Sequence, residues 1–277
     1  MAVALTAPAV AAADTSGSDN WSGYAVHANH KTFKQVSGTW GQPTGTCSAG
    51  RATYSAYWVG LGGYSQTSNA LEQLGTEFDC SAAGVPQLSA WYELVPAPIR
   101  KISMTVEPGD QITGNVSIVG RDVTLTLTDT TRNETFSKTI FDHKIDRTSA
   151  EWITEAPSSC AGSSHCSTLP LTPFGSVTFT GATAVSRSGH SGSISSPLWD
   201  RTKIVLAHTA RFVSTHSPAE ASPSALTNGG TAFTVSYSSP APSTPPPTAT
   251  PPAYGGGGDG GGGYGGGGGW YPGGGWR

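Results

Sequence analysis

Short segments in which apolar and polar side chains alternate recur through most of this chain. The clearest is 123–128, Val-Thr-Leu-Thr-Leu-Thr, which would present apolar side chains on one face of a strand and threonines on the other. Arg132-Asn133-Glu134 follows it as a hairpin turn. We find no convincing amphipathic helix of about ten residues. We therefore expect an all-β fold, for which an antiparallel sandwich is the natural architecture.

The compact part of the chain is predicted to run from 20 to 239 as one β domain. Turn residues divide it into many short segments with strand character. The predicted strands are 33–40, 52–60, 88–95, 101–106, 111–119, 122–128, 135–141, 150–155, 176–183, 203–210 and 231–237.

The two ends of the chain differ in composition from this domain. Residues 1–14 are mostly small and apolar and contain an Ala-Ala-Ala site, typical of a secretory signal cleaved before Asp14, so 1–19 is interpreted as a signal remnant or N-terminal extension. Residues 240–254 are rich in Pro and Thr and predict a stiff, extended linker. Residues 255–277 hold 16 of the 37 glycines, so we expect a disordered C-terminal tail.

Charge and cysteine content narrow the class of protein. Charged residues make up 12% of the chain and the net charge is −3, unlike the basic surface of a nucleic-acid binder. After the N-terminus no apolar stretch approaches the length of a membrane span. Four cysteines predict two disulfides, Cys160 with Cys166 and therefore Cys47 with Cys80, in a secreted, extracellular protein. Zinc is less favoured because no Cys-x-x-Cys occurs, and we expect no metal or other cofactor.

Two blocks carry residues suited to chemistry: 71–75, Leu-Glu-Gln-Leu-Gly, and 150–155, Ala-Glu-Trp-Ile-Thr-Glu, each in a strand-like run. The carboxylate of Glu155 could activate a water molecule, and the amide of Gln73 could stabilise the oxyanion that forms. Together they would suffice for peptide hydrolysis without a metal or a Ser or Cys nucleophile. Glu151 lies four residues from Glu155, so a regular strand points both to the same face, and Glu151 is the alternative base.

In order and spacing, these blocks and several others resemble the glutamic peptidases (eqolisins, peptidase G1). The matching blocks are 20–25 (Asn-Trp-Ser-Gly-Tyr-Ala), 36–40, 57–63 (Tyr-Trp-Val-Gly-Leu-Gly-Gly), 71–75, 90–93 (Ala-Trp-Tyr-Glu), 108–110 and 150–155. The resemblance implies a β-sandwich of two long, curved antiparallel sheets, a concanavalin- or lectin-like jelly roll whose concave face binds substrate. It also implies that Gln73 and Glu155 are the catalytic pair of a secreted acid endopeptidase acting on polypeptides and insensitive to pepstatin.

The resemblance extends to residues around the pair. Trp21, Trp58 and Trp91 are candidate walls of the substrate groove, with core packing as the alternative. Glu93 is a second carboxylate that could share protons with Glu155 or anchor a hydrogen bond. Better-known relatives carry acids where this chain has Gly62 and Ser89, which leaves the depth of an acidic pH optimum open.

Two other classes of function remain as alternatives. One is a jelly-roll glycoside hydrolase, against which Gln73 argues because a second carboxylate would be needed in that place. The other is a non-catalytic carbohydrate-binding or adhesion protein, which the abundant aromatic residues would suit. Tyr and Trp in the Gly-rich tail could give weak contact with cell-wall polymers or other polysaccharides, although a low-complexity extension without a ligand is the simpler interpretation. A monomer is the default.

Overall fold

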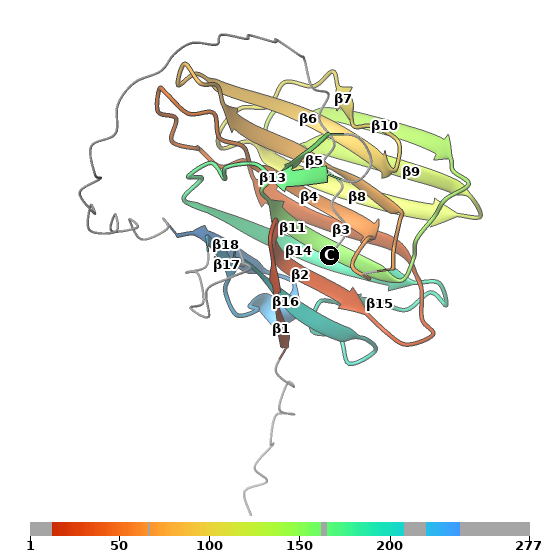
Figure 1. The fold of residues 1–277 in the computed structure, drawn as a ribbon. Coiled ribbons are helices and arrows are strands. Elements are labelled where there is room, and N and C mark those ends of the chain that lie inside the picture. The colour runs from red at the N-terminus through yellow and green to blue at the C-terminus, as the bar shows by residue number, and fades with distance from the viewer. Residues whose placement is uncertain (1–12, 66, 162–164, 208–219, 239–277) are drawn as a thin grey trace, which may run out of the picture.

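The computed structural model describes residues 13–65, 67–161, 165–207 and 220–238 (Figure 1). The predicted linker 240–254, the predicted tail 255–277 and most of the predicted signal segment lie outside these residues. Among the described residues the single helical element is a three-residue 3-10 turn, Asn228–Gly230. In the same part of the chain, no helix has the length and apolar character needed to span a membrane.

The prediction of an all-β, antiparallel fold is confirmed. Strands join in the order β10-β9-β8-β3-β14-β18-β17-β16-β2-β11-β4-β5-β6-β7, with β15 on β14. One pairing is parallel, between β1 and β16. The strands are β1 (Asp14–Ser18), β2 (Trp21–His27), β3 (Phe33–Gly41), β4 (Ala56–Gly62), β5 (Leu71–Cys80), β6 (Pro86–Val95), β7 (Arg100–Ile102), β8 (Gln111–Val119), β9 (Asp122–Asp129), β10 (Glu134–Phe141), β11 (Ser149–Glu155), β12 (Ser158–Ala161), β13 (His165–Thr168), β14 (Ser176–Ser186), β15 (Ser191–Ser193), β16 (Asp200–Leu206), β17 (Ala221–Pro223) and β18 (Phe233–Tyr237).

The large sheet folds back on itself, so that its two halves face each other (Figure 1). Side-chain hydrogen bonds cross between the halves. For example, Trp40 Nε1 on β3 donates to Thr76 Oγ1 on β5 at 2.9 Å, and Trp152 Nε1 on β11 donates to the Ser37 carbonyl on β3 at 2.8 Å. The strands thus form one continuous hydrogen-bonded path through β18, β17 and β16, where the sequence predicted two separate sheets.

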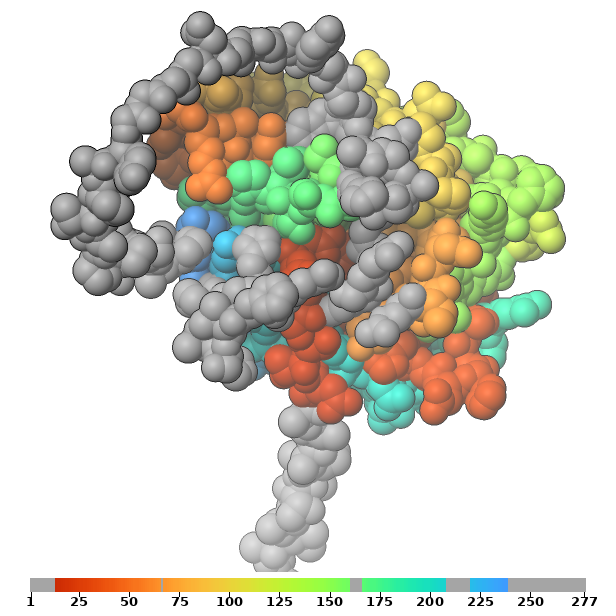
Figure 2. Space-filling model, in the orientation of Figure 1, coloured from red at the N-terminus to blue at the C-terminus, as the bar shows by residue number. Residues whose placement is uncertain are grey.

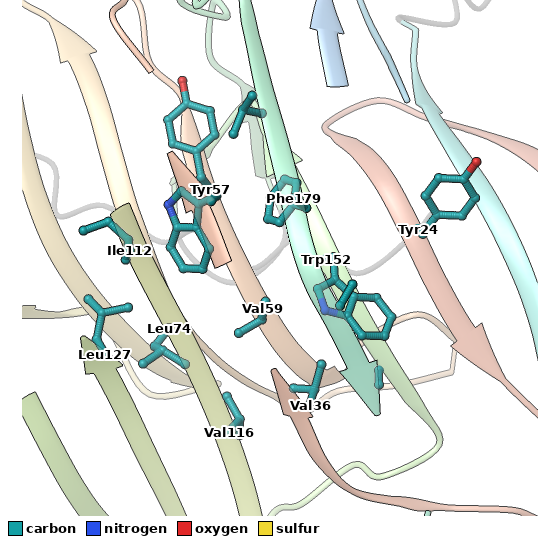
Figure 3. Close-up of a cluster of buried hydrophobic side chains, with 14 of the residues drawn as sticks. Tyr24, Val36, Tyr57, Val59, Leu74, Ile112, Val116, Leu127, Trp152 and Phe179 are labelled. Carbon is teal, nitrogen blue, oxygen red and sulfur yellow. The ribbon is translucent and has the colours of Figure 1, made fainter. Parts of the chain in front are cut away.

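The main apolar core lies between these halves. Figure 3 shows Val59, Leu74, Val116 and Trp152 from both halves packed together, and all four are fully buried. Close approach is possible because a Cβ on Gly38 would lie 2.7 Å from Trp152 Cδ1, a distance that real Cβ atoms do not reach. Successive side chains of a strand point to opposite faces of the sheet. Every second side chain of β2, β4, β5, β6 and β11 therefore lies on the face opposite this core.

Each predicted strand overlaps an observed one, with differences at the ends. The predicted strand 101–106 is shortened to β7, and 203–210 begins earlier, at Asp200. The prediction did not include β2, because side chains on both of its faces are buried and the alternation disappears. It also placed the domain start at 20, whereas β1 pairs with β16 from Asp14 onwards.

The predicted disulfide between Cys47 and Cys80 is confirmed, with an S–S distance of 1.96 Å. It ties the segment before β4 to the end of β5. Cys166 is also disulfide-bonded, and its backbone lies opposite that of Cys160 in the β12–β13 hairpin. The side chain of Cys160 lies outside the described residues.

Candidate active site

The candidate site lies on the outer face of β2, β11, β4, β5 and β6, which we call the site face. It carries a second apolar cluster, built around Trp21, Trp58 and Trp91, that is separate from the main core. Gln73 lies on this face, whereas Leu74 lies in the main core, as strand alternation requires. In Figure 2 the N-terminal strands, in red, adjoin the green β12–β13 segment that follows Glu155.

Strand register arranges the site face in three rows. A polar row contains Glu151, Gly60, Gln73 and Glu93. The next row contains Ile153, Trp58, Gly75 and Trp91. A second polar row contains Trp21, Glu155, Ala56, Glu77 and Ser89. Gln73 and Glu155 thus lie in different rows, with a row of large aromatic side chains between them.

Glu155 is 1% exposed and is surrounded by neutral N–H donors. Trp58 Nε1 donates to its Oε2 at 2.8 Å and Asn20 Nδ2 donates to its Oε1 at 3.1 Å. Burial raises the pKa of Glu155 to about 7, and hydrogen bonds from Trp58, Trp21 and Asn20 oppose that rise. This carboxyl group is therefore able to gain and lose a proton near neutral pH, as a general base must.

Gln73 and Glu93 form a buried pair one strand further along. Gln73 Nε2 donates to Glu93 Oε2 at 2.8 Å, and the two residues are 0% and 2% exposed. Burial raises the pKa of Glu93 to about 9, the Gln73 bond lowers it, and the charge of Glu155 raises it further. The Gln73 amide and the charge of Glu155 thus both act on the pKa of Glu93.

The Trp58 indole fills the gap between Glu155 and Gln73. Its Nε1 contacts Glu155, while its Cζ3 lies 3.0 Å from where a Cβ on Gly60 would be, and Gln73 Cβ lies 3.2 Å from the same point. Because Gly60 has no side chain, there is room for the Trp58 ring next to Gln73. The result is an aromatic floor with a carboxylate at one end and an amide at the other.

Glu151, the alternative base, has a different environment. It is 0% exposed, and neither carboxyl oxygen makes a hydrogen bond of ordinary geometry to any residue in the described part of the chain. Burial raises its pKa well above the usual range, the Ser149 hydroxyl lowers it, and the acids Asp146 and Glu72 raise it further. Its electrostatic neighbours are therefore not Gln73 and Glu93, although register places it in their row.

The three tryptophans predicted as groove walls are all buried, at 2%, 0% and 0% exposed for Trp21, Trp58 and Trp91. Trp21 and Trp58 pack edge to face with ring centroids 5.0 Å apart. Trp58 also donates a hydrogen bond to Glu155, and the Trp21 indole helps to lower the pKa of Glu155, roles that the sequence did not suggest. Asn20 was missed as well, although it begins one of the family-like blocks.

Gly62 and Ser89 stand where related sequences are expected to carry acids, and both have polar neighbours in this chain. Asp146 covers Gly62, since its Cβ lies 2.5 Å from where a Cβ on Gly62 would be. Ser89 donates a short hydrogen bond to the Glu77 carboxylate, which also pairs with Lys101 at 3.3 Å. Among the described residues, no group of three or more His, Cys, Asp or Glu side chains is arranged to hold a metal ion.

Several known peptidases resemble this chain in sequence or fold. The sequence profile described as the peptidase A4 family matches residues 19–236. Scytalido-glutamic peptidase, solved with a peptide-based transition-state analogue, is 25% identical with a TM-score of 0.64, over 79% of this chain and 98% of that one. SCP-B, an eqolisin solved with the tripeptide Ala-Ile-His, is 25% identical with a TM-score of 0.61, over the same shares. Aspergilloglutamic peptidase from Aspergillus niger is 26% identical with a TM-score of 0.52, over 67% and 99%. No curated protein sequence matches the chain.

Proposed function

The chain belongs to the peptidase A4 family and is a glutamic-type endopeptidase, and we propose that Glu155 is its general base and Gln73 its oxyanion donor. The observation that carries the proposal is the buried Glu155 carboxyl group, held by neutral N–H donors beside the Gln73–Glu93 pair. Neutral donors stabilise the ionised carboxylate without supplying a proton of their own. Glu155 is thereby kept as a proton acceptor in a site from which most water is excluded.

In the proposed reaction, ionised Glu155 takes a proton from a water molecule as that water attacks the scissile carbonyl carbon. An N–H of the Gln73 amide donates to the oxyanion of the tetrahedral intermediate, a contact typically worth about 3 kcal/mol. Protonated Glu155 then gives its proton to the leaving amine, and the C–N bond breaks. Glu93 accepts from Gln73 Nε2 and so orients the amide.

The pH dependence follows from these groups. Because the base must be ionised, kcat/KM should rise with pH up to about 7, the pKa of Glu155. Glu93 keeps its proton up to about pH 9 and sets the upper limit if its ionisation disturbs Gln73. The acid optimum implied by the sequence then requires bound substrate to lower the pKa of Glu155. That lowering would appear in kcat, which reports the complex, and not in kcat/KM, which reports the free enzyme.

We further propose that the enzyme acts outside the cell on polypeptides, as a monomer. The Cys47–Cys80 disulfide supports an oxidising compartment. Several buried carboxyl groups with raised pKa values, Glu72, Glu93 and Glu151, suit a protein whose fold is most stable in acid. The glycosidase alternative gains no support from this pair, since Gln73 stands where a glycosidase would need a second carboxylate.

The test is cleavage of denatured casein by the full chain from pH 2 to 9, with pepstatin, a chelator, and serine and cysteine reagents each present in turn. Activity insensitive to all of them is expected. Gln73→Ala should lower kcat by about 10²–10³-fold. An inactive but folded wild type that binds soluble polysaccharides would favour the carbohydrate-binding alternative, and release of reducing sugar would favour the glycosidase.

A further inference from the structure

The turn between β1 and β2 contacts the proposed base directly. The Ser18 hydroxyl donates to Asn20 Oδ1 at 3.2 Å and accepts from the backbone N–H groups of Trp21 and Asn20 at 3.0 and 3.3 Å. Because its oxygen is held by Ser18, the Asn20 amide turns its nitrogen to Glu155 Oε1 at 3.1 Å. The orientation of this amide is therefore fixed by a second residue and not by Glu155 alone.

The same turn is attached to the sheet on both sides. The backbone carbonyl of Asn20 accepts from the N–H of Ala156, the residue after Glu155, at 2.8 Å. The carbonyl of Ser18 accepts from the N–H of Ala207 at 2.9 Å, at the end of the β1–β16 pairing. Ser18 and Asn20 are 6% and 8% exposed, so water competes little for these contacts. The turn is thus a rigid support on which the Asn20 side chain is presented to the base.

We propose that Asn20 is a positioning residue that stabilises the ionised form of Glu155 and fixes its orientation, and that Ser18 holds Asn20 in that role. The inference rests on the proposed function, in which Glu155 is the base. The Asn20 amide is neutral at every pH of interest, so it favours the carboxylate without competing for the proton. Its loss should therefore make Glu155 harder to ionise, with little effect on substrate binding.

Asn20→Asp is the sharpest variant, because it keeps the shape of the side chain and replaces the N–H donor by an oxygen. Two carboxyl groups would then face each other, and one of them has to keep a proton. In the plot of kcat/KM against pH, we expect the rising limb to move to higher pH by about one to two units. KM should be nearly unchanged, and kcat should recover at high pH. Ser18→Ala should also move the rising limb to higher pH, by a smaller amount than Asn20→Asp does.

Asn115→Asp is the matched control, since it makes the same chemical change on β8, in the other half of the sheet. In this variant, the rising limb of kcat/KM against pH should stay at the wild-type position. Thermal melts of all variants, and of Asn20→Ala, identify any that fail to fold, and Ser18→Ala tests the inference if Asn20→Asp does not fold.

A folded Asn20→Asp variant with the wild-type limb, or with a change in KM alone, would overturn the inference. A different result would overturn the proposed function itself. If Glu155 is not the base, Glu155→Gln keeps its activity. If Glu155→Gln is inactive while the Asn20 and Ser18 variants keep the wild-type limb, Glu155 is the base and only the positioning role of Asn20 is wrong.

Discussion

Glu155 and Glu151 lie on the same strand and the same face, four residues apart, and yet their surroundings are opposite. Glu155 accepts hydrogen bonds from Asn20 and Trp58, and its pKa is raised only to about 7. Glu151 is equally buried but has acidic neighbours, and its pKa is raised well above the usual range. Burial alone thus does not make a base. What separates the two glutamates is whether neutral donors offset the cost of burying the charge.

The largest expected effect is on turnover. Glu155→Gln should lower kcat by about 10²–10⁴-fold, since it removes the proton acceptor at constant side-chain volume. Glu151→Gln makes the same chemical change on the same face and should leave kcat close to wild type, because Glu151 lacks the N–H donors that stabilise an ionised carboxylate at Glu155, and burial raises its pKa. Casein cleavage by the two variants, with thermal melts to confirm folding, gives the comparison. The opposite ranking would identify Glu151 as the base.

The next largest effect is on how the free energy of unfolding depends on pH. Glu72 is 0% exposed, its Oε1 accepts from the Asp146 N–H, and its pKa in the folded chain is raised to about 9. Because the folded pKa is raised, the unfolded chain ionises first, so stability is greatest below about pH 4.5 and is lost as pH rises towards 9. The loss is about 1.4 kcal/mol per pH unit for a fully buried group.

Glu72→Gln and Glu151→Gln should therefore flatten this dependence. Urea unfolding at pH 4 and pH 8 should show a smaller stability difference in each variant than in the wild type. Glu134→Gln, a change on the outer strand β10, serves as the control and should leave the difference intact. Equal pH dependence in all four proteins would mean that the buried carboxyls titrate normally.

A smaller effect is expected from the donors themselves. Trp58→Phe removes the 2.8 Å hydrogen bond to Glu155 and should move the rising limb of kcat/KM up by about one to two pH units. Trp91→Phe is the matched control, because Trp91 lies in the same cluster but its Nε1 has no hydrogen-bond partner among the residues that the structure describes. If both variants shift the limb equally, ring packing and not the N–H group sets the pKa.

The sequence predicted the local features of this comparison well. Alternation and turn residues gave the β class, and the two blocks with Gln73 and Glu155 gave the residues proposed for the chemistry. Alternation also placed Glu151 on the same face as Glu155, as the structure shows. Cysteine count gave the Cys47–Cys80 bond.

The missing features depend on contacts between distant parts of the chain. Asn20 reaches Glu155 across 135 residues, and no local pattern reports that contact. Asp146 covers Gly62 because β11 pairs antiparallel with β4, so the segment before β11 lies next to the end of β4. Likewise, β1 is mostly exposed and polar, so only its parallel pairing with β16 shows that it belongs to the fold.

The central claim is that Glu155 ionises before Glu151. Carbon-13 NMR titration of the Glu side-chain carboxyl carbons tests it directly, with Glu155→Gln and Glu151→Gln used to assign the two signals. The account predicts a midpoint near pH 7 for Glu155 and a higher midpoint for Glu151, whose burial is not offset by N–H donors. A Glu151 signal that titrates at lower pH than that of Glu155 would contradict the account.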